Sequence, residues 1–486
     1  MPEQSLKDKT AKGFFWGALN NGTMQILNAV FGIIIARELT QEDYGLVGML
    51  LVFSTIAAAL QDSGFVTALV NKKDATHRDY NSVFWFNICI SFLLYIILCA
   101  ASPLIAKVYN EPRLVSLACY QFIGFFIASF SIIPRAILFK NLRQKELAIM
   151  SVVSLILSGC VGVAMALNGM AYWGIATQSI TFTLSNVVIS WWYSKWRPSL
   201  KISIQPVREM FGFSSKMLVT YIFNCINNNI FSVLLGLFYR ADTVGTYNQA
   251  NKWNLMGAQT ITGMVQGVAQ PTFVQVGDDM ERLRRSFRKM LRFTSFVAFP
   301  CMFGLALIAP EFITITITEK WISSAMLMRI LCIGGAFLPI ATLYFNLIIS
   351  RGKSDVYMWN IISQGCIMTL TACLVHFLDI NIMGFSGVTL MVILYAGIII
   401  LWIGIWHYFL WREIRLSLFQ TVTDMAPFML IAVIAIFGAY YSTLWADNAY
   451  ILLSLRIIIA AAIYIGILWI LGANILKESL SYLKKK

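Results

Sequence analysis

The chain has 486 residues, of which 58% are apolar and only 12% are charged, and its formal net charge is +14. An average soluble domain carries about a quarter charged residues, so this chain lacks the charge to cover soluble domains of its length. The composition excludes the soluble classes and predicts an all-α polytopic membrane protein, because a helix that crosses a bilayer needs about 20 apolar residues.

Apolar runs of this length follow one another along the chain and predict about fourteen transmembrane helices. The first run is too long and too polar for a cleaved signal peptide, so we interpret it as a permanent span. Only the tight turn Asn168–Gly169 separates the fifth run from the sixth. The predicted spans lie near residues 14–36, 45–69, 82–105, 114–138, 147–168, 170–193, 212–238, 244–272, 291–312, 325–350, 356–378, 382–408, 425–445 and 449–473.

The lysines and arginines predict the orientation of the chain. Most of the 37 lie near the two ends of the chain and in every second connecting segment. Because positive residues favour the cytoplasmic side, we expect an even number of spans and both termini in the cytoplasm. The net positive charge therefore reflects membrane topology, and no nucleic-acid partner is expected.

One cytoplasmic segment, Met280–Leu291, is strongly basic and also has an apolar face. Leu283, Phe287 and Leu291 recur at four-residue spacing. This pattern predicts an amphipathic helix that lies on the inner leaflet. An ordinary positive loop is the alternative.

The stretch from Phe14 to Leu50 occurs a second time, from Met217 to Trp253. The turn residues Arg37, Thr40 and Tyr44 correspond to Arg240, Thr243 and Tyr247. Each copy begins a set of six spans, so the two halves have the same orientation, as parallel repeats do in some transporter families. The repeat predicts an N-terminal six-helix lobe (1–197), a cytoplasmic linker (198–211), a C-terminal six-helix lobe (212–411), and an extra transmembrane hairpin with a basic tail (412–486).

Polar side chains within the spans predict a cavity between the two halves. Helical spacing puts Asn21, Gln25 and Asn28 on one face of the first span, and Asn224 and Asn228 on one face of the seventh. The eighth span carries a polar stripe of Asn248, Lys252, Gln259, Gln266 and Gln270. Polar residues within a membrane usually face a protein interior or water. Hydrogen bonding between helices is the alternative, but a stripe that includes a lysine favours a solvated cavity.

Charged residues near the ends of the spans have two interpretations each. Arg37 and Arg329, near the outer ends of their spans, either contribute to the cavity or snorkel to the interface. Lys216 could meet an anion that enters from the cytoplasm. Asp62 could titrate in an ion-coupling cycle or pair with a nearby lysine, and Arg456 either snorkels or contacts a lipid headgroup.

The expected substrate carries phosphates and hydroxyls. Lysine and arginine would neutralise a diphosphate, and amides can both donate to and accept from sugar hydroxyls. The nine cysteines are scattered without a CxxC motif and the three histidines lie far apart, so no metal site, catalytic residue or cofactor is predicted.

Four short motifs identify a resemblance. They are Lys12-Gly-Phe-Phe-Trp-Gly-Ala, the turn that contains Arg37, Thr40, Tyr44 and Gly45, Gln61-Asp-Ser-Gly-Phe, and Val207-Arg-Glu-Met-Phe-Gly-Phe-Ser-Ser. With these motifs the chain resembles Wzx-type flippases for lipopolysaccharide or exopolysaccharide, which belong to the multidrug/oligosaccharidyl-lipid/polysaccharide export superfamily.

The resemblance implies two six-helix lobes around a central cavity in the bacterial inner membrane. It implies alternating-access transport of a polyprenyl-diphosphate-linked oligosaccharide from the cytoplasmic to the periplasmic leaflet. Implied partners are this substrate, membrane lipids and polysaccharide polymerase or assembly proteins. Lipid II flippases of the superfamily use cavity arginines on spans 1, 2 and 8. Only Arg37 and Lys252 occupy comparable regions here, so lipid II is a weaker candidate than an O-unit or capsule repeat unit.

The last two spans form a lipid-tail groove in the lipid II relatives, which would give Arg456 a role. Two alternatives to the flippase remain open. A multidrug or organic-ion antiporter of the same superfamily would prefer acids and aromatic residues in its cavity. A membrane enzyme of polysaccharide assembly would carry a sizeable outer loop, whereas the outer loops here are short. We therefore predict a transporter rather than an enzyme.

Overall fold

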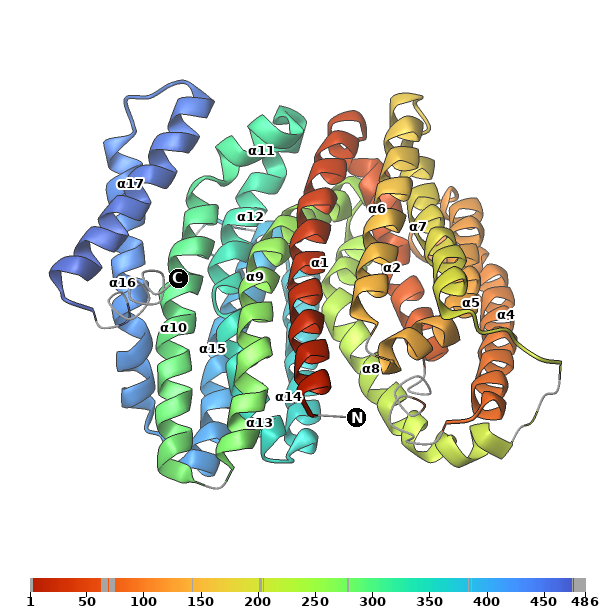
Figure 1. Cartoon of the computed structure of the whole chain (residues 1–486). Coiled ribbons are helices and arrows are strands. Elements are labelled where there is room, and N and C mark those ends of the chain that lie inside the picture. Colours follow the sequence, from red (N-terminus) through yellow and green to blue (C-terminus); the bar gives the residue numbers. More distant parts are fainter. Residues whose placement is uncertain are drawn as a thin grey trace. The chain divides into compact units, whose positions relative to one another are not determined.

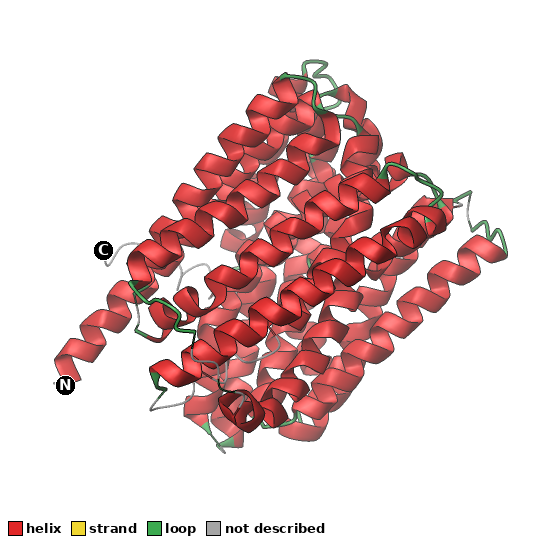
Figure 2. Cartoon of the chain, turned by 90° about the vertical axis from the view of Figure 1, so that its right-hand side faces the viewer, coloured by secondary structure: helices red, strands yellow, loops and turns green. Residues whose placement is uncertain are grey.

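The computed structural model describes residues 3–62, 69, 75–141, 143–200, 203, 205–277, 279–382, 384–385, 387–473 and 475. Within these residues the chain is helical, apart from turns and a single bridge between Ile382 and Phe385. Short loops join the helices (Figure 2). The all-α fold predicted from the composition is confirmed.

The chain forms two compact units, Met1–Gly245 and Thr246–Lys486. The first unit contains the helices coloured red to yellow-green in Figure 1. They are α1 (Glu3–Glu38), α2 (Gln41–Asp62), α4 (His77–Val108), α5 (Leu114–Lys140), α6 (Gln144–Leu167), α7 (Ala171–Ser194), α8 (Gln205–Phe238) and the start of α9 (Ala241–Val276).

The second unit contains the remainder of α9 and the helices that follow it. These are α10 (Met280–Leu307), α11 (Ala309–Ile317), the 3-10 turn η1 (Glu319–Trp321), α12 (Ile322–Gly335), α13 (Leu338–Ser350), α14 (Ser354–Phe377), α15 (Gly387–Ile414), α16 (Leu418–Ser442) and α17 (Ala449–Ile470).

The helices correspond to the predicted spans. The tenth predicted span is broken into α12 and α13, and Pro339, at the start of α13, cannot donate the backbone hydrogen bond that a continuous helix needs. Among the described residues, ten helical segments are long and apolar enough to cross a membrane. The protein is thus a multi-pass membrane protein, and the total of fourteen spans stays a prediction.

The turn between the fifth and sixth predicted spans is present. Helix α6 ends at Leu167, and Gly169 adopts a φ of +72°, a backbone conformation that favours glycine. Helix α7 then packs back along α6, and a Cβ at Gly162 would lie 3.0 Å from the Gln178 side chain. The two apolar runs therefore form a hairpin and not one long helix.

The linker belongs to the first unit, where it packs on the start of α4. Asn81 on α4 accepts a hydrogen bond from the backbone N–H of Ser199 at 2.8 Å, and the Trp85 indole donates to the Ser199 carbonyl at 2.8 Å. The Nε2 atom of His77 lies 3.0 Å from the carbonyl oxygen of Arg197. These bonds satisfy backbone groups that would otherwise lack partners next to the aromatic cluster around Phe84.

The prediction that the basic segment lies on the inner leaflet is wrong. Helix α10 begins at Met280, where Asp279 caps it by accepting from the Arg282 N–H, and continues without interruption to Leu307. Leu283, Phe287 and Leu291 are each 0% exposed. A four-residue spacing of apolar residues is equally compatible with a helix face that is buried in protein. Here the ring of Phe287 packs edge-on against the ring of Tyr344, with 5.2 Å between the ring centroids.

Ion pairs connect helices within the second unit. The Arg288 guanidinium donates to both carboxylate oxygens of Asp424 on α16, at 2.6 and 3.0 Å. Lys353, in the turn before α14, pairs with Glu413 on α15. The first contact holds α16 against α10, and the second holds the turn before α14 against the end of α15.

Candidate functional site

In the first unit, the amides of α1 form an uncovered polar face. Asn21 and Asn28 are exposed and Gln25 is half-buried, in agreement with the spacing that puts all three on one side of the helix. Burying an amide in hydrocarbon without a hydrogen-bond partner costs several kcal/mol. A polar face within a membrane span therefore needs water or a polar ligand beside it.

Helix α8 carries one exposed amide and one that is hydrogen-bonded to a neighbouring helix. Asn228 is exposed, whereas Asn229 donates to the Cys225 carbonyl at 2.8 Å and to the Thr55 hydroxyl of α2 at 3.4 Å. Asn229 thus performs the helix-joining role, and Asn228 remains available on the other side. The side chains of Lys216 and Asn224 lie outside the described residues.

In the second unit, the polar stripe of α9 is half-buried at one end and exposed further along. Asn248 and Lys252 are half-buried, and Gln259 and Gln266 are exposed. The side chain of Gln270 lies outside the described residues. Residues at this spacing follow one side of a helix, so α9 presents amides and an ammonium group along the same line.

The ammonium group of Lys252 is held beside an aromatic ring. Its Nζ lies 5.7 Å from the ring centroid of Trp253, within the range of a cation–π contact. Trp253 is itself buried and packs edge-on against Phe312 at 4.9 Å. Within the described part of the chain, Lys252 has no carboxylate partner. Its positive charge is therefore available to an anionic ligand.

Two further amides of α9 are buried in the second unit. Neither side-chain polar atom of Gln249 has a hydrogen-bond partner among the described residues, and the same holds for Oδ1 of Asn254. Asn254 donates to Asn251 at 3.3 Å and lies against Gly335 of α12, where a Cβ would come within 2.1 Å of its Oδ1. Unsatisfied buried amides cost roughly 1–3 kcal/mol each, so they mark a place suited to water or polar ligand atoms.

Sequence reasoning missed Gln249 and Asn254 because both lie off the polar stripe. A usable signal was the density of amides in one short segment, since Asn248, Gln249, Asn251 and Asn254 occur within two helical turns. Such a density points to polar surroundings on more than one side of α9.

The remaining predicted cations lie at helix ends or in the middle of a shorter helix. Arg37, in the last turn of α1, is exposed, as are Arg240 after α8 and Arg329 on α12. Helix α2 ends at Asp62, whose side chain lies outside the described residues.

Arg456 neither snorkels to the interface nor faces a headgroup. Its Nη1 donates to Oε1 of Glu311 on α11 at 2.7 Å, and the two side chains are only 6% and 11% exposed. The guanidinium also lies 5.2 Å from the ring centroid of Tyr440 on α16. The charge of Arg456 is therefore neutralised inside the second unit.

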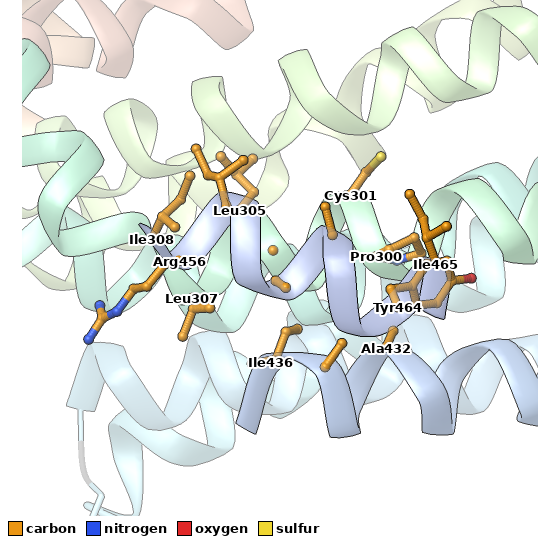
Figure 3. Close-up of a pocket in the computed structure, with 15 residues that line it drawn as sticks. Pro300, Cys301, Leu305, Leu307, Ile308, Ala432, Ile436, Arg456, Tyr464 and Ile465 are labelled. Carbon is orange, nitrogen blue, oxygen red and sulfur yellow. The ribbon is translucent and has the colours of Figure 1, made fainter. Parts of the chain in front are cut away.

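A cavity of about 340 Å³ lies beside this pair, between α10, α16 and α17. Figure 3 shows Arg456 near one end of the cavity, with its guanidinium directed away from it, and Tyr464 at the other end. The wall between them is formed by apolar residues such as Leu305 and Ile436. The Tyr464 hydroxyl donates to the Phe296 carbonyl at 2.9 Å, so the cavity itself is suited to an apolar chain.

Comparison with solved structures places this fold among membrane transporters. "Lipid II flippase MurJ, inward closed conformation" matches with a TM-score of 0.76 and 13% identity, over 94% of this chain and 99% of that one. A multidrug resistance MATE family transporter of the MOP superfamily, in its inward-facing conformation, matches with a TM-score of 0.61 and 12% identity, over 87% and 96% of the two chains. At these low sequence identities, both similarities concern the fold alone.

Comparison with other sequences gives relatives with roles in polysaccharide assembly. The chain is 25% identical to the lipopolysaccharide biosynthesis protein WzxC of Escherichia coli, over 72% of each chain. It is 26% identical to the teichuronic acid biosynthesis protein TuaB of Bacillus subtilis, over 73% of this chain and 74% of that one. The succinoglycan biosynthesis transport protein ExoT of Rhizobium meliloti is 24% identical, over 71% and 70%.

The family model described as "Polysaccharide biosynthesis protein" matches residues 34–326. This region begins near the end of α1 and includes both repeat turns and α9. It covers more than half of the chain, and the protein accordingly belongs to this family of polysaccharide biosynthesis proteins.

Proposed function

We propose that this protein is a flippase that moves a polyprenyl-diphosphate-linked oligosaccharide repeat unit from the cytoplasmic to the periplasmic leaflet by alternating access. The repeat unit that it delivers would be used in lipopolysaccharide, capsule or exopolysaccharide assembly. The family, the relatives in lipopolysaccharide, teichuronic acid and succinoglycan biosynthesis, and the flippase fold all support this proposal.

The observation that carries the proposal is the unneutralised Lys252 on the amide-rich helix α9. A diphosphate is the part of the substrate that is most costly to move through a membrane, and a partly desolvated ammonium group would offset that cost. Amides suit the sugars, because each can both donate to and accept from hydroxyl groups. Asn21, Gln25 and Asn28 of α1, Asn224 and Asn228 of α8, and Asn248, Gln259 and Gln266 of α9 would supply these contacts.

The other residues of the proposed pathway have separate tasks. Arg37 and Lys216 would meet the diphosphate near the two ends of the pathway. The apolar cavity between α10, α16 and α17 would hold part of the polyprenyl chain. Asp62 would couple transport to an ion, and substitution of Asp62 with asparagine would then abolish transport without loss of protein.

The lobes 1–197 and 212–411 would be the repeats that rearrange, joined by the linker 198–211, with 412–486 as an added hairpin. We place the protein in the bacterial inner membrane with both termini in the cytoplasm. Polysaccharide polymerase or assembly proteins would receive the flipped unit.

A multidrug or organic-ion antiporter is the second candidate, because the fold is also that of MATE transporters. Lys252 disfavours this function, since a cation with no carboxylate partner among the described residues repels organic cations. Tests with cationic drugs would separate the two, because only the antiporter would export them.

The deciding experiment is complementation by Lys252→Ala in a strain whose surface polysaccharide depends on this gene. We expect loss of surface glycan at normal protein level, with lipid-linked oligosaccharide accumulating on the cytoplasmic face. Lys252→Arg should retain part of the activity because it keeps the charge. Lys107→Ala, which removes an exposed cation at the end of α4, is the control and should behave as the unsubstituted protein. Normal glycan with Lys252→Ala would contradict the assignment.

A further inference from the structure

A second cavity of about 480 Å³ lies between α10, α12 and α16. It shares Leu307 and Ile436 with the cavity in Figure 3 but is otherwise separate. Its volume is within the range of sites that bind small molecules, about 300–1,000 Å³. Phe303, Ile333 and Phe437 contribute to its apolar wall.

Among the described residues that line this cavity, Arg329 is the one that carries a charge. Its side chain is exposed, and within the described part of the chain it has no carboxylate partner. Arg456, by contrast, lines the first cavity but is neutralised by Glu311. The second cavity therefore offers the charge of Arg329 to a ligand, whereas the charge of Arg456 beside the first cavity is already neutralised.

The polar and apolar parts of the second cavity are arranged along α12. Arg329 and Ile333 are one helical turn apart, on the same side of the helix and about 6 Å apart along its axis. Tyr440 of α16 also lines this cavity, and its hydroxyl has no hydrogen-bond partner among the described residues. A ligand that fits has an anionic group at the Arg329 end and an apolar chain beside Ile333 and Phe437.

We propose that this cavity binds an anionic membrane phospholipid, with the phosphodiester at Arg329 and one acyl chain against Ile333 and Phe437. The guanidinium group donates in a planar fork that matches phosphate oxygens, and Tyr440 adds a further donor. A bilayer surrounds these helices, so phospholipid is the amphipathic anion present at the highest concentration. The bound lipid would occupy the groove between α16 and α12 and would act apart from the transported substrate.

Lipid binding to the purified full-length protein tests this proposal without any transport assay. Native mass spectrometry would count phosphatidylglycerol and phosphatidylcholine of identical acyl chains at matched concentrations. We expect one phosphatidylglycerol to bind about tenfold more tightly than phosphatidylcholine, a difference equivalent to ~1.4 kcal/mol. Arg329→Gln should remove this preference, whereas Lys107→Gln, which removes an exposed cation on α4, should preserve it.

A second pair of variants tests the apolar part of the site. Ile333→Trp would fill the cavity and should weaken binding of both lipids, whereas Leu401→Trp, on an exposed surface of α15, should leave both unchanged. Equal affinity of the unsubstituted protein for the two lipids would overturn the proposal, as would a preference that survives Arg329→Gln. Stronger binding of undecaprenyl phosphate that depends on both Arg329 and Ile333 would assign the cavity to the substrate chain instead and would also overturn it.

Discussion

Gly45 on α2 lies so close to Ala241, the first residue of α9, that a Cβ at position 45 would come within 1.7 Å of the Ala241 carbonyl oxygen. The relationship is reciprocal, because a Cβ at Gly245 would come within 1.8 Å of the carbonyl oxygen of Gln41, the first residue of α2. The two copies of the repeat therefore meet backbone to backbone at their turns. Asp43 and Asp242 lie in the first turns of the two helices and offset the positive ends that meet there.

Substitution of Gly45 with alanine should separate the two turns, because backbone atoms cannot yield as a flexible side chain can. We expect a destabilisation of about 3 kcal/mol and a lower apparent melting temperature in detergent. Gly22→Ala on α1 is the control, since no atom of the described residues lies within 4 Å of a Cβ there, and alanine in a helix should be neutral or stabilising by about 0.5 kcal/mol. Equal melting temperatures for the two variants would show that the turns do not depend on this contact.

The buried pair of Arg456 and Glu311 predicts an asymmetry between single and double substitutions. Arg456→Gln leaves a carboxylate buried without its partner, and we expect a loss of about 3–5 kcal/mol. The double variant Arg456→Gln with Glu311→Gln removes both charges and should recover most of this loss. Thermal unfolding of both single variants and the double variant forms a double-mutant cycle. Additive effects would mean that the pair does not contribute as a unit.

The sequence was sufficient for the helices but not for the contacts between them. Apolar runs and the turn at Gly169 are local properties, so the hairpin of α6 and α7 could be predicted. Glu311 and Arg456 are far apart in the chain, and no local pattern reveals that they pair. The spacing of Leu283, Phe287 and Leu291 fits a lipid surface and a protein interior equally well, and only the packing of α10 distinguishes them.

The candidate site also contains some positions that the sequence predicts and others that it does not. The exposed positions of Asn21, Asn28, Gln259 and Gln266 agree with the helical periodicity that grouped them. Gln249 could not be recognised from periodicity, because its burial depends on how α9 packs in the second unit. The sequence leaves open whether Arg329 contributes to the polar cavity or snorkels to the interface, and it does not reveal that Arg329 lines the cavity between α10, α12 and α16.

The ion pair between Arg288 and Asp424 should stabilise the attachment of α16 to α10. Asp424 is only 6% exposed and receives two hydrogen bonds from Arg288, so we expect Asp424→Asn to cost about 2 kcal/mol. Arg288→Lys should not preserve the full stability, because lysine lacks the planar fork. The measurement is thermal unfolding in detergent at moderate salt.

Glu281→Gln is the matched control for this prediction. It breaks an ion pair with Arg285 on the same helix, but both side chains are 76% exposed, so the change in stability should stay within about 0.5 kcal/mol. If Glu281→Gln and Asp424→Asn lower the melting temperature equally, burial does not strengthen the Asp424 pair and the attachment of α16 has another origin.

The connection between α4 and α5 predicts an acid-sensitive contribution to stability. Glu111 accepts two hydrogen bonds from Arg113, at 2.7 and 2.8 Å, and these hold the pKa of the Glu111 carboxyl below its usual value of 4.5. Because the folded state has the lower pKa, the contribution is fully present above the unfolded value and is lost as the pH falls through the folded one. We expect the apparent melting temperature to fall less between about pH 6 and pH 3 in Glu111→Gln than in the unsubstituted protein. Glu38→Gln, which removes an exposed carboxylate at the end of α1, is the control and should retain the full acid dependence. If the melting temperatures of Glu111→Gln and Glu38→Gln fall equally with pH, the role of Glu111 is contradicted.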